Sequence, residues 1–188
     1  HSQLQFGALI GIQELLGNVA GTRDTYRAVS HCTVIRFSSA LFKAFLENNG
    51  LLSHMGSVMD KVEFLRKTRL FAEQTTFQLI HIAQQMEMLT VPAGGRIVIG
   101  AGQQLWLVVR GGVQLTNGGE GAVVLVEPTD FFGEESYLTD EPSGWQSTAT
   151  CATELYRLEQ ATINKIPIVL WRMLEEHDKR VKQLRMVS

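Results

Sequence analysis

The residues best suited to recognise a ligand lie in two short runs, residues 131–135 and 142–149. A Gly-Glu pair in the first run lets the backbone approach a ligand closely and offers a carboxylate to sugar hydroxyls. Aromatic and hydroxyl side chains in the second run can stack on a flat ligand or hydrogen-bond to it. The candidate ligand-binding residues are Gly133, Glu134, Glu135, Trp145, Gln146, Ser147 and Thr148.

Each of these side chains also has a purely structural interpretation. Glu134 either binds sugar hydroxyls or caps the short helix that follows it. Trp145 stacks on a flat ligand, fills an empty pocket or packs as an ordinary indole. Ser147 and Thr148 either bind a neutral ligand or are hydroxyls at the start of a strand. The residue types alone leave these alternatives open.

Composition and charge exclude several classes of protein. The 188 residues carry a formal net charge of −2, which argues against a general nucleic-acid-binding surface. The basic residues of the last predicted helix are balanced by acids and predict a solvated face; they are Lys179, Arg180, Lys182 and Arg185. No apolar run reaches the ~18 residues of a membrane span. We expect a cytoplasmic protein, or the cytosolic part of a membrane protein.

The sequence lacks the spacings that carry catalysis or metal binding. Its two cysteines, Cys32 and Cys151, are too few for a disulfide framework and have no metal-ligand spacing. We find no nucleophile elbow, phosphate-binding loop or paired acid and base. We therefore expect no catalytic residue, no metal site and no enzyme activity.

Hydrophobic periodicity predicts a β-rich block between helices. Thr75 and Gln78 have capping-box spacing, which predicts a helix over residues 76–88. Short strands punctuated by glycines follow, and a long helix is expected over residues 168–186. The predicted strands are residues 96–99, 105–109, 112–116, 122–126 and 154–158. This order predicts a mainly β fold with flanking helices, in the form of an antiparallel jelly roll or small barrel.

The chain also contains an internal repeat. Residues 33–37 have a strand-like pattern and resemble residues 154–158 at an offset of 121. Two later stretches share a heptad seam at an offset of 119. The seam residues are Leu51, Met55, Val58, Val62 and Leu65 in the first stretch, and Leu170, Leu174, His177, Val181 and Leu184 in the second. We predict that residues 1–66 are the C-terminal part of a first copy and that residues 67–188 are a complete copy.

Together these features resemble the cyclic nucleotide-binding domain family, with its catabolite activator-like β-roll. The resemblance rests on residues 132–134, which are similar to the Phe-Gly-Glu of the family's phosphate-binding cassette, and on residues 70–71, 92–94 and 105–113. It implies that a glutamate contacts the ribose of the nucleotide and that an arginine holds the cyclic phosphate. Glu134 matches the glutamate.

The arginine that the resemblance implies is missing. Residues 112–155 contain no Arg or Lys. In the partial copy the reverse is true, because Arg23 lies near the arginine position whereas Ala8 replaces the glutamate. The loss of a charged hydrogen bond to a buried phosphate costs about 1.5–3 kcal/mol. Ordinary binding of cAMP or cGMP is therefore not expected.

The resemblance implies a non-enzymatic regulatory or sensory module of a larger protein, with no cofactor beyond a cyclic nucleotide or another small ligand. One alternative is a genuine sensor that takes an arginine from elsewhere, such as Arg96, Arg110 or an arginine of a partner chain. Another is the sensor part of a catabolite activator-type transcription regulator. The expected partners are other domains of a parent protein and a second copy of the chain, bound through the helix over residues 168–186. No nucleic-acid partner is expected for this chain alone.

Overall fold

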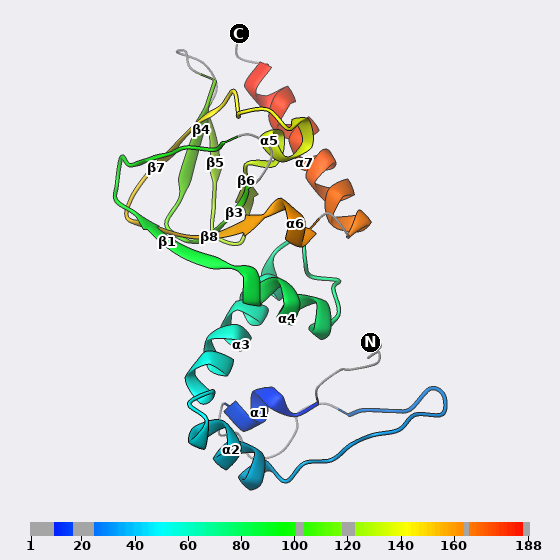
Figure 1. Cartoon of the computed structure of the whole chain (residues 1–188). Helices are drawn as coiled ribbons and strands as arrows, with labels where there is room; N and C mark the ends of the chain where they lie inside the picture. The colour runs from blue at the N-terminus through cyan, green and yellow to red at the C-terminus, as the bar shows by residue number, and fades with distance from the viewer. Residues whose placement is uncertain (1–9, 17–24, 101–103, 118–122, 164–165, 186–188) are drawn as a thin grey trace.

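The computed structural model describes residues 10–16, 25–100, 104–117, 123–163 and 166–185. Its helices are α1 (Ile12–Leu16), α2 (Ser39–Asn48), α3 (Leu52–Lys67), α4 (Thr76–Gln85), α5 (Glu134–Thr139), α6 (Gln160–Ile163) and α7 (Pro167–Arg185). Its strands are β1 (Glu87–Val91), β2 (Arg96–Ile97), β3 (Gln104–Arg110), β4 (Val113–Thr116), β5 (Val123–Val126), β6 (Phe131–Phe132), β7 (Gln146–Ala149) and β8 (Thr153–Glu159). Figure 1 shows the strands gathered into one body, with α7 beside it and α3 leading away toward α1 and α2.

The body of the fold consists of two antiparallel sheets of four strands each. One sheet has the order β1-β8-β3-β6, and the other has the order β2-β7-β4-β5. In the first sheet β8 lies between two partners, with Leu155 opposite Leu89 of β1 and Tyr156 opposite Leu107 of β3. This arrangement confirms the predicted antiparallel β-roll with flanking helices.

Alternation along β3 divides the hydrophobic core into two clusters. Trp106 and Val108 belong to a cluster between the two sheets, whereas Leu105 and Leu107 belong to a cluster on the helical side. Successive side chains of a strand point to opposite faces, so a strand buried on both faces contributes to both clusters. The helix-side cluster also contains residues of α3, α4, α6 and α7. It therefore fixes the helices to the outer face of the first sheet.

The capping box predicted at the start of α4 is present. The side chain of Thr75 accepts a hydrogen bond from the N–H of Gln78, and the Gln78 side chain accepts one from the N–H of Thr75 at 3.0 Å. The helix ends at Gln85 rather than at residue 88, because Glu87 already begins β1 and pairs with β8. The strand predicted over residues 96–99 is likewise shorter and ends at Ile97.

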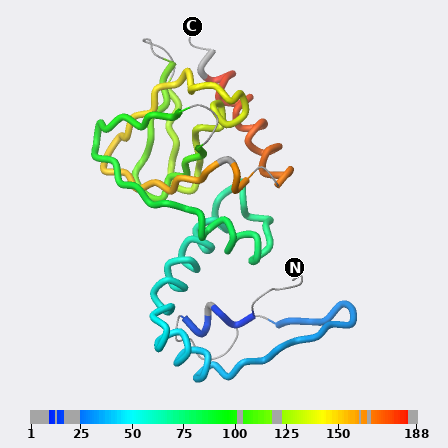
Figure 2. The backbone as a smooth tube through the Cα atoms, in the orientation of Figure 1, coloured from blue at the N-terminus to red at the C-terminus, as the bar shows by residue number. Residues whose placement is uncertain are grey.

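The strand-like pattern of residues 33–37 is not realised as a strand. These residues belong to a segment over 25–38 that loops away from the helices and returns to α2 (Figure 2). A strand requires a hydrogen-bonded neighbour, and no strand among the described residues lies beside this segment. The division into copies at residues 66 and 67 stays a prediction. Ala8 and Arg23 lie outside the described residues.

The first heptad seam packs on the roll. Val58, Val62 and Leu65 of α3 are buried in the same cluster as Leu79 of α4 and Tyr156 of β8. Helix α3 therefore shares a hydrophobic core with the roll that follows it.

Within the part of the chain that the structure describes, no helix combines the length and the apolar character that a membrane span requires.

Candidate functional site

The backbone of the candidate site turns at a glycine between β6 and α5. Gly133 has a φ of +90°, and a Cβ at this position would lie 2.9 Å from the carbonyl oxygen of Gln104. Glycine is therefore required for the turn, since it alone combines a positive φ with the absence of a side chain. Phe132 stacks on Trp106 with 6.2 Å between ring centroids. This contact fixes the start of the turn inside the roll.

Glu134, the first residue after this turn, forms a buried ion pair with Arg180 of α7. The exposed fraction of the two side chains is 0% and 2%, and Nη1 of Arg180 lies 2.8 Å from Oε2 of Glu134. Nη2 of the same arginine lies 3.1 Å from Oδ2 of Asp130. The guanidinium also lies over the ring of Phe131, 5.0 Å from its centroid. One arginine of the last helix thus bridges two acids on either side of β6.

Charge and burial are closely coupled in this pair. Burial raises the pKa of Glu134, and the positive charge of Arg180 opposes the rise. Burial also lowers the pKa of Arg180, but the carboxylates of Glu134 and Asp130 more than offset this effect, so the pKa of Arg180 is raised. A carboxylate without access to water needs such a partner to remain ionised. The charge on Glu134 therefore depends on α7 being in place.

Glu135 organises the loop that follows α5. Its Oε2 accepts hydrogen bonds from Oγ of Ser143 at 2.6 Å and from the N–H of Gly144 at 3.0 Å. Oγ of Ser143 in turn accepts a hydrogen bond from the N–H of Trp145 at 3.1 Å. These bonds set the position from which Trp145 approaches α7.

Trp145 covers the site from the side of α7. Its indole stacks on the ring of His177, with 5.5 Å between centroids and 25° between planes. The indole is half-buried and also packs against the cluster between the sheets. His177 and Arg180 are three residues apart on α7, so adjacent positions of one helix face contact Trp145 and Glu134.

The remaining candidate residues lie on β7 and are not equally placed. Gln146 is exposed and Thr148 is half-buried, whereas Ser147 is buried. Oγ of Ser147 forms no hydrogen bond with any described residue. A buried hydroxyl without a partner is uncommon in folded proteins. The structure thus brings Glu134 and Trp145 into contact with Arg180 and His177 of α7 and leaves Gln146 at the surface.

The prediction that Arg180 lies on a solvated face of the last helix is wrong, because its side chain is buried. A sequence signal for its burial exists, because Arg180 follows Val169 and Met173 at eleven and seven residues, which places all three on one helical stripe. Val169 and Met173 are fully buried. A second signal is the pair of glutamates in a cassette without a cation, since a buried carboxylate requires a partner from another part of the chain.

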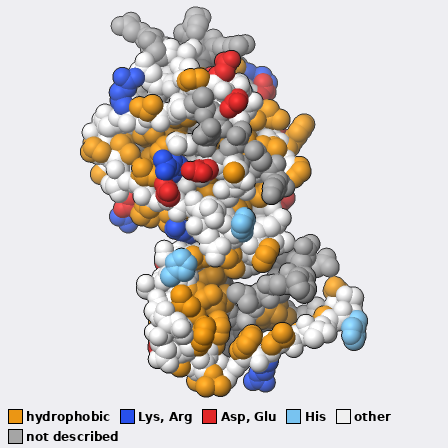
Figure 3. Space-filling model, in the orientation of Figure 1, with side chains coloured by type: hydrophobic (Ala, Val, Ile, Leu, Met, Phe, Trp, Pro, Cys, Tyr) orange, Lys and Arg blue, Asp and Glu red, His pale blue; other side chains and the backbone are white. Residues whose placement is uncertain are grey.

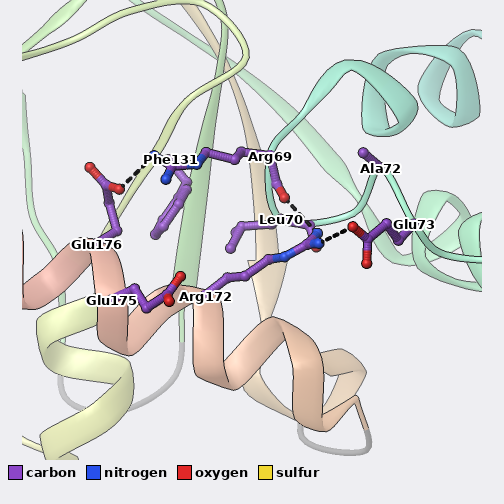
Figure 4. Close-up of a pocket in the computed structure, with 8 residues that line it drawn as sticks. All are labelled: Arg69, Leu70, Ala72, Glu73, Phe131, Arg172, Glu175 and Glu176. Carbon is purple, nitrogen blue, oxygen red and sulfur yellow. Dashed lines mark hydrogen bonds and ion pairs between the residues drawn. The ribbon is translucent and has the colours of Figure 1, made fainter.

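A hollow of about 350 Å³ lies beside α7, between this helix and the connection from α3 to α4 (Figure 4). Two ion pairs hold its walls together: Arg172 lies 2.7 Å from Glu73, and Arg69 lies 2.9 Å from Glu176. Arg172 also donates to the carbonyl oxygen of Leu70 at 3.3 Å. Four of the charged groups that line it pair with one another, so we interpret the hollow as an attachment of α7 rather than as the ligand site.

Tyr137 of α5 gives a pH-dependent test of how the cassette packs. Its side chain is 4% exposed, and burial raises its pKa from 10.0 to about 12. Because the folded pKa is the higher one, the folded state is fully favoured below pH ~10 and loses stability as the pH rises toward ~12. Two pKa units correspond to about 2–3 kcal/mol. We expect Tyr137→Phe to remove most of this alkaline loss in urea unfolding at about pH 8 and pH 11.5.

The matched control for this experiment is Tyr26→Phe, because Tyr26 is 45% exposed. This variant should retain the alkaline loss of the original protein. An equal loss in the Tyr137→Phe and Tyr26→Phe proteins would contradict the burial of Tyr137.

The described residues contain no group of three or more His, Cys, Asp or Glu side chains that could hold a metal ion. Cys32 and Cys151 are both exposed.

Comparison with known proteins relates the roll to one family. The sequence model described as the cyclic nucleotide-binding domain matches residues 93–167. This segment contains the candidate residues from Gly133 to Thr148. A search of curated proteins gives no match.

Solved structures with the same fold include regulatory and sensor domains. The regulatory domain of Toxoplasma gondii PKA, in a co-crystal with cAMP, is 27% identical with a TM-score of 0.53, over 59% of this chain and 44% of that one. The sensor domain of the transcriptional regulator DNR from Pseudomonas aeruginosa is 14% identical with a TM-score of 0.54, over 67% and 91%. The regulatory subunit of a cAMP-independent protein kinase A from Trypanosoma cruzi, bound to guanosine, is 17% identical with a TM-score of 0.53, over 68% and 53%. The chain thus spans about half the length of the two kinase regulators.

Proposed function

Because the roll of residues 93–167 belongs to the cyclic nucleotide-binding domain family, we propose that this chain is a non-enzymatic regulatory module that does not bind cAMP or cGMP in the ordinary way. The observation that carries the proposal is the buried ion pair between Glu134 and Arg180. The carboxylate that the family resemblance assigns to ribose already has a charged partner from α7. The position at Glu134 where a ribose would bind is therefore closed by helix α7 of the same chain.

The balance of charge in the cassette supports this proposal. Arg180 is shared between Glu134 and Asp130, and residues 112–155 supply no other cation. A cyclic phosphate would add a negative charge beside acids that already outnumber the arginine. Arg96 and Arg110, the other candidate cations, are exposed. The missing charged hydrogen bond lowers the affinity for a phosphate by about 10- to 150-fold.

The regulatory element of the proposed module is α7. Its inner face holds the cassette through Arg180 and His177, and its outer face exposes Ile168, Trp171 and Leu174 at 41%, 60% and 47%. Other domains of a parent protein, or a second copy of the chain bound through residues 168–186, would act through this outer face. We place the module in the cytoplasm or in the cytosolic part of a membrane protein.

Thermal unfolding with added nucleotides tests the proposal. A ligand at 100 times its Kd stabilises a protein by about 2.7 kcal/mol, which would raise Tm by about 5–10 °C here. We expect cAMP, cGMP and c-di-GMP at about 1 mM to raise Tm by less than ~2 °C, and by no more than 5′-AMP does. A rise of about 5 °C or more that is specific to a cyclic nucleotide would overturn the proposal in favour of a genuine sensor.

A second candidate function is the binding of a neutral nucleoside, which needs no cation. Two observations favour it: Oγ of Ser147 is buried without a partner, and Oε1 of Glu134 accepts no hydrogen bond from another described residue. Ribose hydroxyls can donate to a carboxylate that is also paired with an arginine, because each carboxylate oxygen has separate lone pairs. Adenosine, guanosine and inosine in the same melting experiment decide this point. A rise with a nucleoside that Ser147→Ala and Glu134→Gln both weaken would support it, and an unchanged Tm would eliminate it.

A further inference from the structure

The described side chains with buried polar atoms that form no hydrogen bond all lie in the roll, in α5 or in α7. They are Trp106, Glu134, Ser147, His177 and Arg180. The ion pair accounts for Arg180 and for Oε2 of Glu134, but Oε1 of Glu134, Oγ of Ser147 and Nδ1 of His177 remain without a partner. In Figure 3 hydrophobic atoms gather over the N-terminal helices, apart from these groups. Groups able to recognise a polar ligand are therefore concentrated at the cassette.

The indole of Trp145 lies among these unpartnered groups. Trp145 and Ser147 are two residues apart, so they point to the same side of the chain, and that side faces the cluster between the sheets. His177 stacks on the indole from α7. Arg180, one turn further along α7, holds Glu134. The indole thus occupies a place that a carboxylate, a hydroxyl and an imidazole border.

A flat heterocycle carrying hydroxyl groups has the chemistry that this place requires. The separation of 5.5 Å between the Trp145 and His177 ring centroids is that of an offset stack, which a nucleobase also forms with aromatic side chains. Indole and purine are both fused, flat rings of five and six members. The free oxygens of Glu134 and Ser147 can hydrogen-bond to sugar hydroxyls. Trp145 therefore fills the position that a base would take.

The segment that carries Trp145 is attached to the roll by few contacts. Residues 140–142 and 144 are exposed, and pairing with β4 begins only at Gln146. The N–H of Trp145 is held by Oγ of Ser143 at 3.1 Å, and Ser143 is held in turn by Glu135. A segment with exposed hydrogen bonds can open locally while the core stays folded. The indole can therefore leave its place without unfolding the sheet.

We propose that the indole of Trp145 is a plug, which occupies the place where the base of a neutral nucleoside would stack on His177. The proposal rests on the proposed function, because it concerns the same closed site. Only molecules whose indole has swung out can bind the nucleoside, so the apparent affinity is reduced by the fraction that is open. Removal of the indole should open the site without any change at Glu134.

Calorimetric titration of Trp145→Ala with adenosine and with guanosine tests the proposal. We expect at least ~10-fold tighter binding than in the original protein, which corresponds to a plug that is out in one molecule in ten or fewer. The matched control is Trp171→Ala, which removes an indole of α7 that is 60% exposed and should bind no more tightly than the original. Adding His177→Ala to Trp145→Ala should cancel the gain. Equal affinity of Trp145→Ala and the original protein would overturn the proposal, as would a gain that persists without His177.

A fluorescence measurement tests the plug in a protein that keeps Trp145. Trp171→Phe leaves Trp145 and Trp106, and the latter is only 5% exposed, so acrylamide quenching reports chiefly on Trp145. Adding His177→Ala should raise the quenching constant at least ~2-fold, because the indole loses the ring on which it stacks. The control is His54→Ala, an exposed histidine of α3, which should leave quenching unchanged. Equal quenching with His177→Ala and His54→Ala would mean that the roll alone holds the indole, and the proposal would fail.

The same variant separates this proposal from the proposed function. Cyclic AMP has the base and sugar of adenosine together with a phosphate, so the missing cation should make it bind Trp145→Ala more weakly than adenosine does. Tighter binding of cAMP than of adenosine by Trp145→Ala, with none by the original protein, would contradict the charge argument of the proposed function and still support the plug. Tight binding of cAMP by the original protein would overturn both.

Discussion

Arg180→Met is expected to lower the free energy of unfolding by about 3–5 kcal/mol at neutral pH, the usual cost of removing one partner from a buried ion pair. Methionine is unbranched and fills much of the space of the arginine stem, so the change removes charge more than volume. The Glu134 carboxylate, which is 0% exposed, then loses its ion-pair partner. Urea unfolding of the two proteins at about pH 7 measures the loss.

The loss should be smaller in acid. Without the arginine, the largest effect that opposes burial is lost, so the pKa of Glu134 rises further above the ordinary value of 4.5. An acid with a raised folded pKa favours the folded state fully below its unfolded pKa, and that advantage is lost as the pH rises through the folded pKa. The difference between Arg180→Met and the original protein should therefore be less at about pH 4.5 than at about pH 7.

Two further variants make the result specific to this ion pair. Lys182→Met removes a cation of the same helix whose side chain is 63% exposed and paired with Asp178, and it should cost less than about 1 kcal/mol. Adding Glu134→Gln to Arg180→Met removes the buried charge and should restore part of the lost stability. If Arg180→Met were as stable as Lys182→Met at neutral pH, α7 would not be held to the cassette by charge.

The roll could be predicted from the sequence because its strands follow simple local rules. Alternation on β3, glycine turns between strands and the capping box at Thr75 each act over a few residues, and the structure contains all of them. The segment over residues 33–37 has the same local pattern but is not a strand. Strand formation depends on a neighbour far away in the chain, which no local pattern can report.

The candidate site was less predictable because its central contact joins residues 46 positions apart. Gly133 and Glu134 could be identified from their local motif, but Arg180 could not be assigned as the partner of Glu134 without the placement of α7. The heptad seam also did not identify the buried face of α7 correctly. Leu174 of the seam is 47% exposed, whereas Met173 and Arg180 are buried. A seam chosen by hydrophobicity alone omits an arginine that is buried because of an acid on another element.

Gly133→Ala is expected to destabilise the protein by about 3 kcal/mol or more, since it adds both backbone strain and a steric clash. The φ of +90° is one that an alanine rarely adopts. The new Cβ would also lie 2.9 Å from the Gln104 carbonyl oxygen and 3.2 Å from Cδ1 of Trp106. A backbone movement that relieves these contacts would shift Glu134 away from Arg180. The variant therefore either keeps the strain or weakens the ion pair.

Gly144→Ala is the matched control in the same cassette. A Cβ at Gly144 would meet Oε1 of Glu135 at 3.5 Å, an ordinary contact, and this glycine has no positive φ. It should change Tm by no more than about 2 °C, whereas Gly133→Ala should lower it by about 6 °C or more. Equal melting of the two variants would mean that the turn into α5 tolerates a side chain. The placement of Glu134 beneath α7 would then have to depend on Arg180 alone.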